Sequence, residues 1–150
     1  MTTKIPKPMV DALYQLTGED LDATLFMADI WYLSQVWDDC IDGDAYDMNE
    51  VFMIALSKIP QNNFYRRYMR DLTPIINQCI MDWKTANVLE QRQEGEDLNR
   101  AYMLRASPYR LFHYCLLLIH GMDEAIRLGP ELWSIYGESL DDFLLEMKHA

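Results

Sequence analysis

The spacing of apolar residues constrains the fold of this chain more than any other feature. Apolar side chains recur every three or four positions, as at Ile76, Cys79, Ile80 and Trp83, which is the period of an amphipathic helix. No stretch alternates apolar and polar residues beside a hairpin turn, as β-strands would. Half of the 150 residues are hydrophobic, which is enough for a sizeable core. We therefore predict an all-α, single-domain bundle of about six to eight helices over residues 1–150.

Glycine and proline residues mark the expected ends of these helices. Gly43 should end one long helix, and the pairs Thr73-Pro74 and Ser107-Pro108 each resemble an N-cap followed by proline in the first turn. Residues 1–7 contain two lysines and are expected to form a flexible basic arm. The predicted helices cover about 8–17, 20–41, 51–59, 64–72, 74–93, 97–105, 109–119 and 131–147. Gly121 either ends the seventh of these or lies within a helix that continues to Leu128.

The charge distribution limits the partners that this chain can bind. Its net charge is −11, and residues 8–57 contain eleven acids and no lysine or arginine. Such a surface repels phosphate backbones and anionic lipids, so we expect no direct nucleic-acid binding and no membrane binding. A basic partner protein, bound cations, or simple solubility each remain consistent with the acidic segment. The basic segment 64–70 is expected to form ion pairs with it.

One acidic motif concentrates this charge at the end of the long helix. Asp38 lies four residues and Asp39 three residues before Asp42, and each spacing places the two carboxylates on a shared helical face. They also lie at the helix C-terminus, where the macrodipole disfavours anions. Solvent, a nearby arginine or a divalent cation such as Mg²⁺ has to compensate them. The surface predicted to bind a basic partner consists of Asp38, Asp39, Asp42, Asp44 and Asp47.

The segment Asp38-Asp39-Cys40-Ile41-Asp42 resembles the DDxxD motif of class I isoprenoid and terpene synthases, in a shortened and degenerate form. Those enzymes are all-α, and their motif binds Mg²⁺ that holds a prenyl diphosphate. Residues 130–138 are similar to the second metal motif of the family, although Pro130 occupies the leading ligand position. The resemblance implies metal ligands at Asp38, Asp39, Asp42, Ser134, Glu138 and Asp142.

The same resemblance implies an arginine and an aromatic cavity near the metal. Arg105, ahead of the Ser107-Pro108 break, is similar to a family arginine that faces the diphosphate. The walls of the cavity would include Trp31, Trp37, Phe112 and Trp133, although aromatic residues at helical spacing also suit an ordinary core.

Cysteine usage predicts a cytoplasmic protein. Cys40, Cys79 and Cys115 are widely spaced and odd in number, so we expect buried, reduced thiols rather than disulfides. Residues 1–8 also lack the apolar core of a secretion signal.

Two functional hypotheses follow from the sequence. The first is a small, non-catalytic acidic protein that binds a basic partner protein. The alternative is Mg²⁺-dependent binding or ionisation of an allylic diphosphate in a helical cavity, and the sequence leaves open whether the protein is an enzyme. The alternative requires the Asp38–Asp42 and Ser134–Glu138 faces to meet at one cavity mouth.

Overall fold

The computed structural model describes residues 5–149, and all the regular secondary structure in this part of the chain is helical, which confirms the all-α prediction. Three short elements, α3, the π-helix η1 and α4, follow one another without a break. Residues 5–149 therefore form eight helical segments, within the predicted range. The elements are α1 (Lys7–Leu16), α2 (Leu21–Asp42), α3 (Met48–Met53), η1 (Ile54–Lys58), α4 (Ile59–Gln61), α5 (Asn63–Arg92), α6 (Asp97–Arg105), α7 (Ser107–His120), α8 (Met122–Ser134) and α9 (Leu140–Lys148).

The long helix α2 ends at the predicted glycine and begins at an aspartate cap. The Asp20 side chain accepts a hydrogen bond from the backbone N–H of Ala23 (3.0 Å), which satisfies a free donor of the first turn. Gly43 takes the left-handed conformation (φ 79°) that ends the helix. At the N-terminus of the chain, Lys7 already belongs to α1, so the predicted flexible arm is wrong at this residue. The first four residues of that arm lie outside the described residues.

Pro74 does not separate two helices as predicted, because α5 continues through it. The proline ring removes one backbone donor, but Pro74 is exposed, so the ring points to solvent rather than into the core. The buried side chains Leu72 and Trp83 lie on either side of it and keep both halves packed. Tertiary packing therefore overrides the local stop signal.

The predicted helix over residues 131–147 is also wrong, because Pro130 lies inside α8 and the chain leaves the helical conformation soon after Ser134. We call residues 135–139 the α8–α9 linker. The Tyr102 hydroxyl donates to the backbone carbonyl of Glu138 in this linker (2.6 Å). Ser139 then caps α9 by accepting a hydrogen bond from the Asp142 N–H (3.1 Å). These two interactions stabilise a break where the sequence pattern favours a continuous helix.

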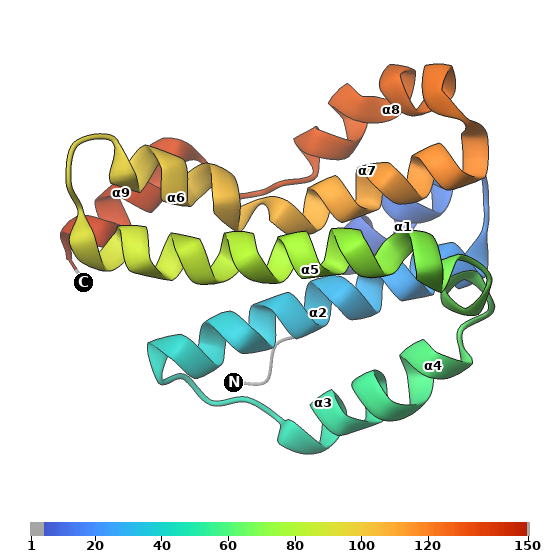
Figure 1. Cartoon of the computed structure of the whole chain (residues 1–150), viewed down its shortest axis with the longest axis horizontal. Coiled ribbons are helices and arrows are strands. Elements are labelled where there is room, and N and C mark those ends of the chain that lie inside the picture. The colour runs from blue at the N-terminus through green and yellow to red at the C-terminus, as the bar shows by residue number, and fades with distance from the viewer. Residues whose placement is uncertain (1–4, 150) are drawn as a thin grey trace.

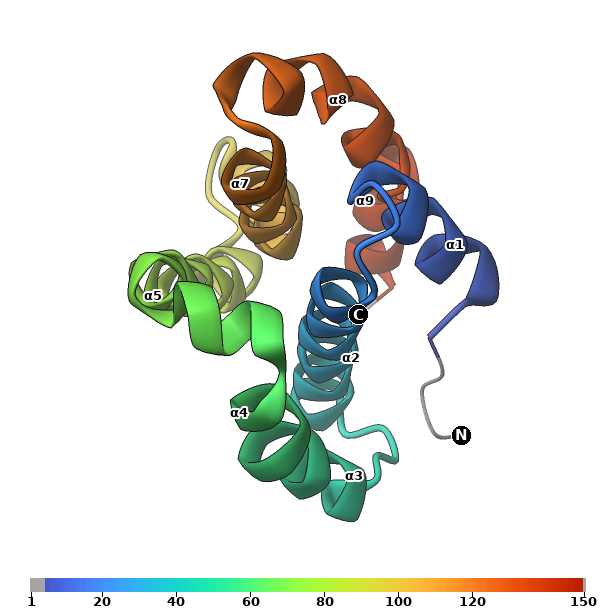
Figure 2. The same ribbon diagram turned by 90° about the vertical axis from the view of Figure 1, so that its right-hand side faces the viewer.

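The helices are arranged around α5, which runs along the length of the molecule (Figure 1). α2 lies along one side of α5, and α6 and α7 follow it on the other side (Figure 1). Viewed from the end, α1, α2, α5 and α7 surround a common interior, with α3 and α4 beyond α2 and α8 beyond α7 (Figure 2). The end of α2, α6 and α9 all lie at the same end of the molecule (Figure 1).

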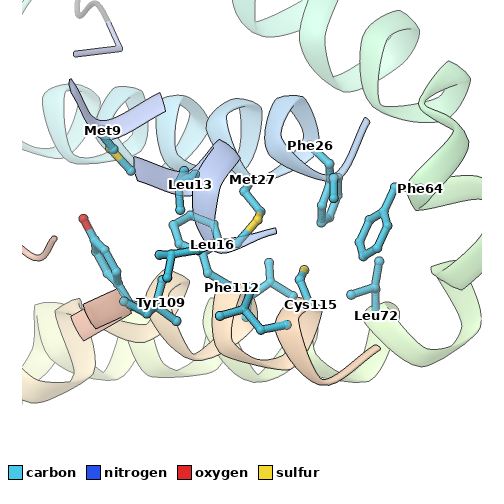
Figure 3. Close-up of a cluster of buried hydrophobic side chains, with 14 of the residues drawn as sticks. Met9, Leu13, Leu16, Phe26, Met27, Phe64, Leu72, Tyr109, Phe112 and Cys115 are labelled. Carbon is cyan, nitrogen blue, oxygen red and sulfur yellow. The ribbon is translucent and has the colours of Figure 1, made fainter. Parts of the chain in front are cut away.

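The main core fills the interior between α1, α2, α5 and α7 (Figure 3). Phe26, Phe112 and Leu13 are fully buried there, and the rings of Phe26 and Phe64 lie 5.9 Å apart. A smaller cluster of Ala86, Ala101 and Phe143 holds α9 against α5 and α6. Core side chains shown in Figure 3 include Met9, Leu13, Leu16, Phe26, Met27, Phe64, Leu72, Tyr109, Phe112 and Cys115.

Two further predictions about polar groups are corrected by the structure. No salt bridge within residues 5–149 involves the arginines of segment 64–70, so the expected pairing with the acidic segment does not occur. Cys115 is buried and Cys79 half-buried, but Cys40 is exposed at the end of α2, where little chain covers it.

In the part of the chain that the structure describes, no helix is both long and apolar enough to span a membrane.

Candidate functional site

The candidate site begins at the C-terminal end of α2, where the acidic motif lies. Asp38 and Asp39 are half-buried, and Asp42 is exposed one residue before the helix ends at Gly43. Asp44 is exposed in the following turn, and the Asp47 carboxylate caps α3 by accepting from the N–H groups of Asn49 and Glu50. Asp38 and Asp42 face one hollow in the structure, whereas the other three do not line it.

Arg105, at the end of α6, is the cation that meets this motif. Its side chain is only 10% exposed, and one guanidinium nitrogen lies 3.6 Å from a carboxylate oxygen of Asp38. Its Nε donates to Glu90 (2.9 Å), and Nη2 contacts both Glu90 and the Asn87 side-chain oxygen. The guanidinium also lies over the ring of Trp83, 4.8 Å from its centroid. The predicted proximity of Arg105 to the acidic motif is therefore present, although a bidentate partner, Glu90, already holds the arginine.

Two carboxyl groups near Arg105 are easier to protonate than usual. Burial, and then the neighbouring charge of Asp42, raises the pKa of Asp38 to about 6, although Arg105 opposes this shift. Burial, and then the charge of Glu146, raises the pKa of Glu138 to about 6. Both groups therefore change charge close to neutral pH, where an added cation would favour their ionised forms.

Two adjoining hollows surround this charge cluster. The larger has a volume of about 520 Å³ and is lined by Trp31, Tyr109 and Tyr136 together with Glu138. The smaller, of about 120 Å³, is lined by five carboxylate side chains and Arg105. The two share Gln35, Trp83, Arg105, Tyr136 and Glu138, so they form one continuous site with an aromatic part and an acidic part. The five carboxylates are Asp38, Asp42, Glu90, Glu138 and Glu146.

Only one of the four aromatic residues predicted to form the cavity wall does so. Trp31 lines the larger hollow. Trp37 stacks on Trp83 instead, with ring centroids 6.0 Å apart, and Phe112 belongs to the buried core. Trp133 packs against Tyr109 from outside the cavity lining. The other wall residues of this kind come from α5, α7 and the α8–α9 linker.

The second predicted metal motif is only partly brought to the site. Glu138 lines both hollows, but Ser134 is exposed and its hydroxyl donates to the carbonyl of Glu131 (2.6 Å). Asp142 is exposed on α9 and does not line either hollow. The break at residues 135–139 separates these side chains, which were expected on one helix. Among the described residues, no three His, Cys, Asp or Glu side chains are placed to hold a metal ion.

The α5 residues that hold Arg105 were not among the residues predicted from the sequence. Trp83, Asn87 and Glu90 are spaced by four and three residues, so they share one face of α5. This face continues the apolar stripe of the helix, and polar residues at the end of a buried stripe indicate a buried partner. That signal was present in the sequence. The contribution of Tyr136 and Glu146 was not, because it depends on the α8–α9 linker.

Comparisons with protein-family models, with curated proteins and with solved structures found no match to this chain.

Proposed function

We propose that this protein is an acidic docking protein that binds a basic, partly apolar segment of a partner protein. The docking surface consists of the carboxylates of Asp39, Asp42, Asp44 and Asp47 and the apolar side chains of Met48, Phe52 and Leu56. It extends from the end of α2 through the connecting turn onto α3 and η1 (Figure 1).

The exposed apolar stripe on α3 and η1 is the observation that carries this proposal. Met48, Phe52 and Leu56 are spaced by four residues and are 46%, 57% and 70% exposed. This spacing places them on one side of the helical segment, while Ile54 and Ile59 are buried on the other. A contiguous apolar stripe beside charged residues is typical of a protein-binding surface.

The charge around the stripe favours a basic partner. Residues 8–57 contain eleven acids and no lysine or arginine. The surface around the stripe therefore keeps a strong negative potential, which accelerates association with a cationic segment. Asp38 was predicted to join this surface, but it faces Arg105 and the hollow instead.

A synthetic helical peptide with leucines on one face and arginines on the other tests this proposal. We expect it to bind the full chain, and to bind more weakly as NaCl is raised from roughly 50 to roughly 500 mM, because salt screens the attraction. Phe52→Ser and Leu56→Ser should each weaken binding by about tenfold or more, since burying such a side chain contributes roughly 1.5–3 kcal/mol.

Leu145→Ser provides the matched control, because Leu145 is also 57% exposed but lies on α9. Binding that is equally affected by the control, or that is insensitive to salt, would contradict the proposal.

A second candidate function is the Mg²⁺-dependent binding of a diphosphate compound. It is favoured by the position of Asp38, Asp42, Glu138 and Arg105 around one hollow. Its ligand set lacks Ser134 and Asp142, so the two predicted metal motifs do not meet as that function requires. A titration with Mg²⁺ and inorganic pyrophosphate, followed by thermal unfolding, tests it. Stabilisation that needs both components supports this function, and no stabilisation rejects it.

A further inference from the structure

We propose that the aromatic hollow is a binding site for an organic ammonium ion that also carries an oxygen acceptor. This site shares only Asp42, which lines the smaller hollow, with the docking surface, and its function does not depend on docking. The cation would lie among the rings of Trp31, Tyr109 and Tyr136, close to the carboxylate of Glu138.

The charge balance of the site favours a positive ligand. Arg105 forms salt bridges to Glu90 and Asp38, and both carboxylates compete for its one positive charge. Within residues 5–149, Asp42, Glu138 and Glu146 form no salt bridge, although all three line the smaller hollow. Five carboxylates around one arginine leave a net negative field at the end of the larger hollow where Glu138 lies.

The walls of the larger hollow suit a diffuse organic cation. Tyr109 and Tyr136 meet edge to face, 5.3 Å apart, and Trp31 belongs to the same wall. Aromatic faces attract ammonium groups, and such rings recognise quaternary ammonium compounds in other proteins. The site already holds one cation in this way, because the Arg105 guanidinium lies over the Trp83 ring. A volume of about 520 Å³ accommodates a small organic ligand.

Two buried donors indicate that the ligand also carries an oxygen. Trp83 is 5% exposed, and its indole N–H is buried without a hydrogen-bond partner among the described residues. Nη1 of Arg105 is likewise buried without a hydrogen bond there, because its 3.6 Å contact with Asp38 is longer than a hydrogen bond. Both residues line both hollows, so a ligand that carries an acceptor atom would lie beside two donors that make no hydrogen bond.

Choline and its uncharged isostere 3,3-dimethylbutan-1-ol test the proposal on the full chain. They have the same shape and hydroxyl group but differ in charge. By calorimetry, we expect choline to bind about threefold to tenfold more tightly than the alcohol. This is the gain in affinity expected from one cation–π contact plus a nearby carboxylate. The indole N–H resonance of Trp83, assigned with Trp83→Phe, should move when choline binds.

Glu138→Gln removes the carboxylate nearest to the aromatic wall, and Glu131→Gln is its matched control on the exposed surface of α8. We expect the first variant to lose the preference for choline over the alcohol and the second to keep it. Equal binding of the two compounds by the wild-type chain would overturn the proposal, even if Glu138→Gln failed to fold. Choline binding without movement of the Trp83 resonance would overturn the assignment to this hollow.

A third titration separates this proposal from the second candidate function. If choline does not bind and the protein is stabilised only by Mg²⁺ with pyrophosphate, the site takes a metal-bound diphosphate and the ammonium proposal is wrong. The docking proposal is unaffected by either result, because its peptide and its variants concern α3 and η1.

Discussion

Replacing Arg105 by methionine tests whether the buried charge cluster is held by this single arginine. Arg105 is 10% exposed and its main partner Glu90 is 15% exposed, so both groups lie largely out of water. Methionine keeps the length and apolar contacts of the side chain but removes its charge and its hydrogen bonds. Glu90, Asn87 and Asp38 then lose their shared partner.

The expected cost follows from the burial of the pair. Removing one partner from a buried ion pair costs about 3–5 kcal/mol, because the other charge stays buried without compensation. For a chain of this length, that loss lowers the midpoint of thermal unfolding by roughly 6–20 °C. The loss of the contact with Trp83 acts in the same direction.

Urea denaturation of the wild type, Arg105→Met and the double variant Arg105→Met/Glu90→Leu measures this cost. The double variant should recover about 2 kcal/mol or more, because it removes the stranded carboxylate. Arg127→Met is the matched control, since Arg127 forms a similar pair with Glu124 at the exposed surface and should unfold like the wild type. If Arg105→Met were no less stable than this control, the reasoning about the buried cluster would be refuted.

Three further predictions concern stability and can be checked by thermal or urea unfolding. Folding raises the pKa of Asp38 and of Glu138 to about 6, so the folded protein binds more protons than the unfolded chain. The stability that these two groups contribute is therefore fully present below their ordinary pKa and is lost as the pH rises through about 6. Lowering the pH from about 7.5 to about 5.5 should therefore raise the unfolding midpoint, and less so in Asp38→Asn/Glu138→Gln. Asn62→Ala should lower the free energy of unfolding by about 1–2 kcal/mol, because this side chain caps α5 and also donates to the Asp22 carbonyl of α2 (2.8 Å). A change close to zero would show that neither hydrogen bond stabilises the fold. Phe112→Ala should lower the free energy of unfolding by about 3–5 kcal/mol, because this ring is fully buried. A smaller loss than that of Asn62→Ala would contradict the assignment of the core.

Local sequence signals predicted helix ends where side chains or backbone geometry act within one turn. Gly43 and Ser107-Pro108 mark ends that the structure confirms, although Ser107 is the first residue of α7 and does not cap it as predicted. Pro74 and Pro130 misled, because an exposed proline bends a helix without ending it when the flanking turns are packed. The break after Ser134 was missed, since the hydrogen bond from Tyr102 that stabilises the α8–α9 linker joins distant parts of the chain.

The candidate site was predictable from the sequence only where its residues share one helix. Asp38 and Asp42 were expected on one face from their spacing, and they face one hollow. The meeting of Asp38 with Arg105 and Glu138 is long-range, and only the resemblance to a known family pointed to it. Ser134 and Asp142 line neither hollow, because their expected placement assumed a continuous helix. Whether this site binds a metal remains a prediction.

The π-helix η1 determines which side of its segment faces the core and which side is exposed. The Ile59 N–H donates to the Ile54 carbonyl, so these two isoleucines lie one wide turn apart, and both are buried. In an α-helix, residues five apart differ in direction by about 140°, and only one of the two would face the core. The π-helical turn therefore holds one residue more than an α-helical turn would, so the side chains at its two ends, Ile54 and Ile59, both face the core. Deleting a single residue from it would rotate Phe52 and its neighbours about the helix axis by about 100° relative to α4, so Ile54 and Ile59 could no longer both face the core.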